Sequence, residues 1–111
     1  MKVLFLVLNN PEYLEDVLSL LVEHDVQGAT ILESQGMGST IVNNGISDIP
    51  LFGSLKNILK DSHPYNKTIF TLIKDEDKLY KVVEAIKHLL NDGNKSDVGL
   101  MFTLPVDEIF S

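Results

Sequence analysis

The stretch Gly28–Ser39, GATILESQGMGS, decides the fold because a predicted β-strand ends there in a Gly-x-Gly turn. Thr30 and Ile31 are β-branched residues, which suit a pleated, half-buried surface. Gly36 and Gly38 can adopt positive φ, and they let other groups approach the backbone closely. We therefore expect a regular strand that ends at a place suited to a ligand or a partner.

The segment before this strand reads as one strand followed by one helix. Lys2–Leu8 (KVLFLVL) is a continuous apolar run of strand length, which predicts a central strand. Asn10 and Pro11 favour a helix start, because Asn caps free amide groups and Pro fits the first helical position. The helix should end near His24. Its apolar stripe has helical spacing and consists of Leu14, Val17, Leu18, Leu21 and Val22.

The segment after residue 66 repeats this order. Lys67–Ile73 (KTIFTLI) predicts a third strand, and the acidic residues 75–77 suit the N-terminus of a second helix. Gly93 is suited to end that helix, and Gly99–Leu104 (GLMFTL) predicts a fourth strand. The apolar stripe of the second helix consists of Leu79, Val82, Val83, Ile86, Leu89 and Leu90.

Two strand–helix–strand units in succession predict an α+β fold of the ferredoxin-like βαββαβ type. It has one four-stranded antiparallel sheet with two helices on one face. At 111 residues we expect a single domain over 1–111. Leu4 and Leu6 alternate with Val3 and Phe5, so the first strand is apolar on both faces. We therefore predict that another subunit covers the face that the helices leave bare.

Composition excludes some functions. The net charge is −7, the nine basic residues are all Lys, and Arg is absent, which argues against a nucleic-acid interface. The chain has no Cys, so it has no disulfide framework and no thiolate metal site, which fits a cytoplasmic protein. The apolar run at residues 3–8 is far too short to span a bilayer.

No catalytic constellation is present. His24 and His88 lie near predicted helix ends, where a cation suits the helix dipole, and His63 lies in the segment between the second and third strands. The acids 75–77 are explained by a helix N-terminus rather than by a metal site. An acylphosphatase, which shares this fold class, would need an Arg. We therefore expect a protein that is not an enzyme and holds no metal.

Residues 40–66 form an insert, and long loops in compact domains are usually functional or disordered. The insert is too apolar for a disordered linker, so it should dock on the body, on a neighbouring subunit or over a ligand. A short helix is expected near residues 51–60. The candidate partner-contacting residues are Phe52, Leu55, Leu59, His63 and Tyr65.

These features together resemble the P-II signal-transduction family. The resemblance rests on the first strand, on LVEHD at 21–25, on VQGATI at 26–31 followed by Gly36-Met37-Gly38, and on GLMFTLPVD at 99–107. It implies a homotrimer whose sheets face inward, with three effector clefts between subunits. Each cleft would lie between the Gly-x-Gly turn of one subunit and the loop before the last strand of its neighbour. The resemblance also implies adenine nucleotides as effectors, and 2-oxoglutarate in some members.

The chain departs from the family pattern in its charges. Ser39 stands where the family has a basic residue, and the family's basic residues after the last strand are missing here. The loop before the last strand reads Asp97-Val98-Gly99-Leu100 instead of Gly-Asp-Gly-Lys. Backbone amides would then supply anion-binding groups. The candidate ligand-binding residues are Thr30, Gly36, Met37, Gly38, Ser39, Lys67, Asp97, Val98 and Gly99.

Three functions stay open at this point. The first is a non-catalytic P-II-like sensor that binds an adenine nucleotide or another small anionic effector and regulates a partner protein through residues 40–66. The second is a divalent-metal-binding trimer of the cation-tolerance type. The third is a constitutive interaction protein without a ligand.

Overall fold

The computed structural model describes residues 1–38, 40, 65–91 and 98–111 of the chain. All four predicted strands and both main helices are confirmed, and the first helix begins at Leu14 rather than at the predicted Pro11, because residues 11–13 form a 3₁₀ turn. The short helix expected at 51–60 lies outside the described residues. The elements are β1 (Lys2–Leu8), a 3₁₀ turn (Pro11–Tyr13), α1 (Leu14–Glu23), β2 (Thr30–Ser34), β3 (Asn66–Ile73), α4 (Glu76–Leu90) and β4 (Gly99–Pro105).

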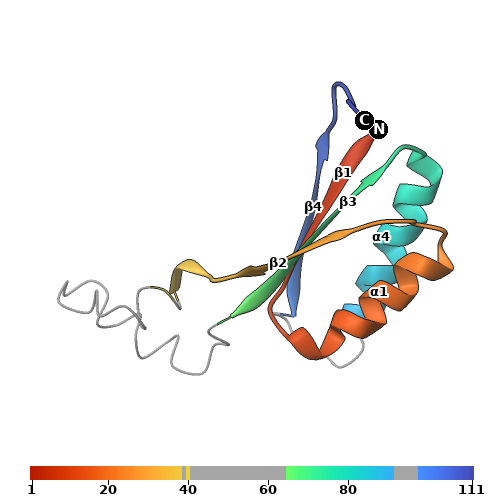
Figure 1. The fold of residues 1–111 in the computed structure, drawn as a ribbon. Coiled ribbons are helices and arrows are strands. Elements are labelled where there is room, and N and C mark those ends of the chain that lie inside the picture. Colours follow the sequence, from red (N-terminus) through yellow and green to blue (C-terminus); the bar gives the residue numbers. More distant parts are fainter. Residues whose placement is uncertain (39, 41–64, 92–97) are drawn as a thin grey trace.

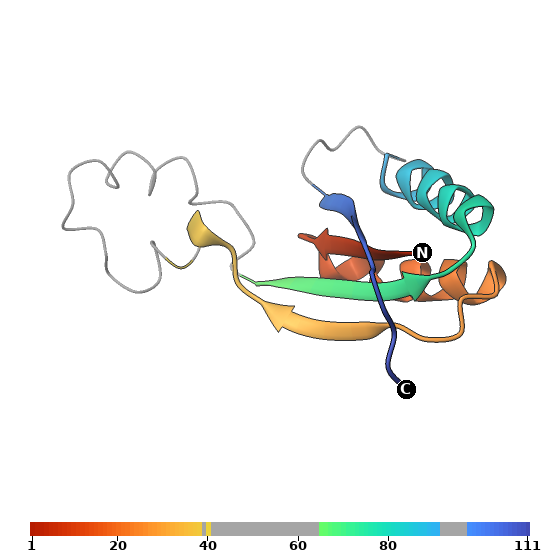
Figure 2. The same cartoon turned by 90° about the horizontal axis from the view of Figure 1, so that it is seen from above.

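The strands form one sheet in the order β2-β3-β1-β4, and each neighbouring pair is antiparallel. β1 is central: Leu6 lies opposite Ile69 of β3 on one side and Met101 of β4 on the other. Both helices pack on the same face of the sheet, and the two views in Figures 1 and 2 agree on this. The predicted ferredoxin-like arrangement is therefore confirmed.

The core lies between the sheet and the two helices. Strand side chains alternate between faces, so Leu4, Leu6 and Leu8 of β1 all point to the helix side and are at most 2% exposed. The helices contribute the apolar stripes that their sequence spacing predicted. Their buried members are Val17 and Leu21 of α1 and Leu79, Val82 and Ile86 of α4.

Hydrogen bonds fix the two ends of the segment that contains the 3₁₀ turn and α1. The Asn10 side chain accepts from the Glu12 amide at 3.0 Å and so caps the 3₁₀ turn, which leads into α1 without a further side-chain cap. At the other end the Val26 amide donates to the Leu21 carbonyl at 2.9 Å, and the Asp25 amide donates to Val22 at 3.0 Å. This pair of bonds is a Schellman motif, and Asp25 occupies its left-handed position with φ 59°. The chain leaves the helix sharply and enters β2.

Neither of the two described helices lies on the second face of the sheet, which we call the bare face. Phe5 at its centre stacks between Phe70, at 5.5 Å between ring centroids, and Phe102, at 5.2 Å. The stacked rings are surrounded by further apolar side chains of the same face. Those with large exposed fractions are Leu32 (49%), Leu72 (38%), Leu100 (61%) and Leu104 (49%), and Phe102 of the stack is itself 42% exposed. Exposed apolar patches of this kind mark interaction sites. The bare, apolar face was predicted, and its cover by another subunit stays a prediction.

Candidate functional site

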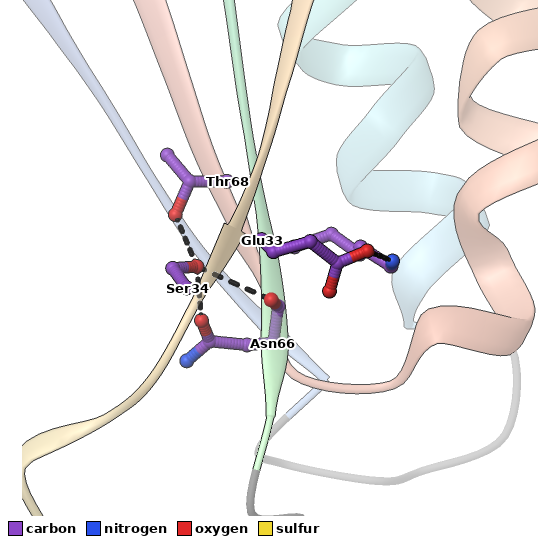
Figure 3. Close-up of polar contacts among 5 residues, drawn as sticks. Glu33, Ser34, Asn66 and Thr68 are labelled. Atoms are coloured by element: carbon purple, nitrogen blue, oxygen red, sulfur yellow. Dashed lines mark hydrogen bonds and ion pairs between the residues drawn. The ribbon is translucent and has the colours of Figure 1, made fainter.

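The insert leaves the sheet at the end of β2 and returns at the start of β3, where Ser34 lies opposite Asn66. Three polar side chains meet here, and we call them the Ser34 cluster: Ser34, Asn66 and Thr68 (Figure 3). The Ser34 hydroxyl contacts the Asn66 side-chain oxygen, lies 3.2 Å from the Asn66 carbonyl and lies 2.8 Å from Thr68 Oγ1. A hydroxyl has one proton and two lone pairs, so Ser34 donates to Asn66 and accepts from Thr68.

An ion pair between Lys67 and Glu33 lies beside this cluster but on the other sheet face. Lys67 is opposite Leu8, whose side chain belongs to the buried core, so the pair is on the helix side. In Figure 3 Glu33 extends toward the helices, whereas the Ser34 cluster lies on the opposite side of the strands. Lys67, a predicted ligand-binding residue, therefore already has an acidic partner within its own chain.

The residues after β2 form a helical turn. Met37, Gly38 and Thr40 have helical backbone conformation, and Gly36 does not have positive φ. The Gly36 carbonyl accepts from both the Thr40 amide (2.9 Å) and the Thr40 hydroxyl (2.8 Å). These bonds stabilise helical backbone, so Gly36 does not use the positive φ that glycine can adopt. Met37, which belongs to this turn, is 79% exposed.

Val98 and Gly99, predicted in the ligand cleft, take part in packing at the start of β4. The Val98 side chain is 5% exposed and belongs to the core, and its carbonyl accepts from the Asn9 amide at 2.8 Å. A Cβ atom on Gly99 would lie 3.1 Å from the Val7 carbonyl oxygen and 3.3 Å from a Leu6 methyl. A larger residue at position 99 would therefore require atoms of β1 to shift, whereas glycine fits this close approach.

Thr30 lies at the other end of β2 from Gly36 and Gly38. Six residues of extended chain span about 20 Å, so one copy of the chain does not bring Thr30 together with the helical turn. Thr30 instead borders a hollow of about 400 Å³ on the bare face, between β1, β3 and the segment after β4. Ile109 and Phe110 border the same hollow, and Phe110 is 87% exposed.

The remaining predicted residues divide into two groups. Tyr65 directly precedes β3 and is 62% exposed. The others lie outside the described residues: Ser39, Phe52, Leu55, Leu59, His63 and Asp97.

The Ser34 cluster was missed by the sequence prediction. Its only sign in the sequence is that Ser34, Asn66 and Thr68 are polar residues near the two strand ends that flank the insert. The bond between them depends on strand register, because Ser34 and Thr68 are 34 residues apart in the chain. Periodicity within one strand carries no information on that register.

The described residues contain neither a candidate metal cluster nor a candidate membrane-spanning helix. Across residues 1–38, 40, 65–91 and 98–111, no group of three or more His, Cys, Asp or Glu side chains is placed to hold a metal ion. The described helices include none that is long and apolar enough to cross a membrane.

Comparison with known proteins places the chain in a family. No individual curated protein matches it significantly. The family description of nitrogen regulatory protein P-II matches residues 1–111, the whole chain. The ferredoxin-like fold and the insert between β2 and β3 agree with the resemblance drawn from the sequence. The chain belongs to the P-II nitrogen regulatory protein family, whose members are signalling and regulatory proteins rather than enzymes.

Proposed function

We propose that this chain is a non-catalytic cytoplasmic regulator that works as a homotrimer. Each cleft between subunits takes a small effector, and residues 40–66 transmit its binding to a partner protein. The observation that carries the proposal is the bare face, since no described residue of the chain covers its stacked Phe5, Phe70 and Phe102 rings or its exposed leucines.

Burial of this face supplies the free energy of assembly. Covering one large apolar side chain contributes about 1.5–3 kcal/mol, and several are exposed on this face across β2, β3 and β4. The Ser34 cluster lies on the same face, at the base of the insert. A neighbouring copy that covers the bare face would therefore come close to the root of the insert.

The effector would contact the residues between β2 and the insert in one copy and the start of β4 in its neighbour. We favour a small anionic effector, with an adenine nucleotide as the first candidate. Lys67 is held by Glu33 on the opposite face, so backbone amides around Met37 and Gly38 are the groups we assign to the anion. The effector shifts the insert only by binding one of its conformations more tightly than the other.

Calorimetry of the full chain with ATP, ADP, AMP, cyclic dinucleotides, 2-oxoglutarate and bicarbonate tests the sensing role. We expect saturable binding by at least one compound, with one site per chain. The same compound at 100 times its Kd should raise the free energy of unfolding by about 2.7 kcal/mol in a thermal-shift assay. If a trimeric sample gave no heat of binding with any of these compounds, the sensing role would be refuted. The homotrimer itself would still stand, as an assembly that binds none of these effectors.

A further inference from the structure

A hollow of about 310 Å³ opens at the end of the sheet opposite the insert. The insert is attached at Ser34 and Asn66, whereas the hollow lies where β3 ends at Ile73. Its walls come from the connection between α1 and β2 and from the connection between β3 and α4, on the side of the molecule away from the insert (Figure 1). The hollow therefore shares no residue with the effector site proposed above.

The apolar part of this hollow consists of Val26, Leu72 and Ile73. Ile73 belongs to the core, whereas Leu72 is 38% exposed. Sites for small molecules combine an apolar lining with a few polar groups, in cavities of about 300–1,000 Å³. The hollow lies at the lower end of this range, so it suits a molecule about as large as an amino acid.

Two lysines border the hollow, and they differ in how they are bound. Lys78 Nζ donates to the Asp25 carbonyl oxygen at 3.0 Å and lies 3.8 Å from the Asp25 carboxylate. The Lys74 side chain, in contrast, makes no hydrogen bond or ion pair with another described residue. The same is true of the Gln27 side-chain amide on the facing wall. Lys74 and Gln27 can therefore both donate to the carboxylate of a bound molecule.

Two aspartates border the same hollow and balance the charge of the lysines. Asp75 caps α4, and one oxygen of its carboxylate accepts from the Asp77 amide at 2.9 Å. Its second oxygen accepts from no other described residue. The Asp25 side chain is 80% exposed and has only the long contact with Lys78. Because two positive and two negative side chains line the hollow, a molecule that carries both charges complements it better than a simple anion or cation.

We propose that this hollow binds a free α-amino acid. The carboxylate of the amino acid would face Lys74 and Gln27, its ammonium group would face Asp75, and its side chain would contact Val26 and Leu72. All the lining residues belong to one chain, so the site does not depend on assembly. It adds a second ligand class to the effector proposed above, at the opposite end of the sheet.

Calorimetric titration of the unmodified chain with each of the protein amino acids tests this site. We expect saturable binding of at least one of them, with one site per chain. The N-acetyl derivative and the amide of that amino acid each lack one of its two charges. Each should bind about tenfold more weakly or worse, because a charge-assisted hydrogen bond is lost. The proposal would be overturned if no amino acid bound saturably, or if the N-acetyl derivative bound as tightly as the free amino acid.

A pair of lysine variants tests where the amino acid binds. Lys74→Gln removes the unpaired charge of the hollow and should weaken binding by about tenfold or more. Lys81→Gln is the matched control, since Lys81 is exposed on α4 and does not border the hollow. Circular dichroism would verify that both variants are folded. Unchanged affinity in Lys74→Gln, or an equal loss in both variants, would overturn the assignment to this hollow. The nucleotide titrations judge the proposed function separately, because neither lysine belongs to the effector site.

Discussion

The Ser34 hydroxyl is the side chain that most directly joins the two strands at the root of the insert. It contacts Asn66 and Thr68, which are 32 and 34 residues away in the sequence. Its neighbours Glu33 and Lys67 join the same two strands on the opposite face. Both sheet faces therefore hold the register of β2 and β3 at the point where the insert begins.

We predict that Ser34→Ala lowers the free energy of unfolding by about 1–2 kcal/mol, because it removes hydrogen bonds from a partly buried cluster. Urea denaturation followed by circular dichroism measures the change. Ser19→Ala is the control, since Ser19 is exposed on α1, and it should change stability by less than about 0.5 kcal/mol. Equal stability of the two variants would show that the cluster contributes nothing to the fold.

At the scale of elements, the sequence predicted every described strand and main helix because each has a clear period and clear end signals. Lys2–Leu8, the stripe of α4 and the Asn10 cap are all read from neighbouring residues.

The candidate site was predicted less well. The helical turn at Gly36 and the partner of Lys67 depend on backbone geometry and on residues of another strand. Such information is absent from local patterns.

The end of α1 gives a second example, because the left-handed position of its Schellman motif is occupied by Asp25 rather than glycine. The Asp25 carboxylate also lies 3.8 Å from Lys78 Nζ. Asp25→Ala and Asp25→Gly both remove this exposed pair, but only alanine keeps the steric cost of positive φ.

We therefore predict that Asp25→Ala is less stable than Asp25→Gly by about 1–2 kcal/mol. Thermal unfolding of both variants under the same conditions measures the difference. Comparison of the wild type with Asp25→Gly gives the combined effect of losing the carboxylate and of relieving the backbone. If alanine were as stable as glycine, the helix would not end through the left-handed residue described here.

At the scale of the whole molecule, two facts oppose each other. Each chain carries a net charge of −7, which favours separation of the copies. On β4 alone, the bare face exposes Leu100, Phe102 and Leu104, and burial of these side chains favours association of the copies. The apolar face is local and contiguous whereas the charge is spread over the chain, so we expect association to win at physiological ionic strength.

We predict that Phe102→Asp dissociates the assembly, because it would bury an unpaired carboxylate between subunits. Phe102 is 42% exposed in the single chain, so helix and strand content should persist in circular dichroism. Val22→Asp is the control, since it introduces the same charge on α1, away from the bare face. Retention of the wild-type mass by Phe102→Asp would place the interface elsewhere.

The mass of the unmodified chain in solution tests the central claim most directly. Multi-angle light scattering across a range of concentrations should give three times the 12.4 kDa of one chain, independent of dilution in the micromolar range. A mass of 12.4 kDa throughout that range would mean that no second copy covers the bare face, and it would contradict the trimer and its clefts.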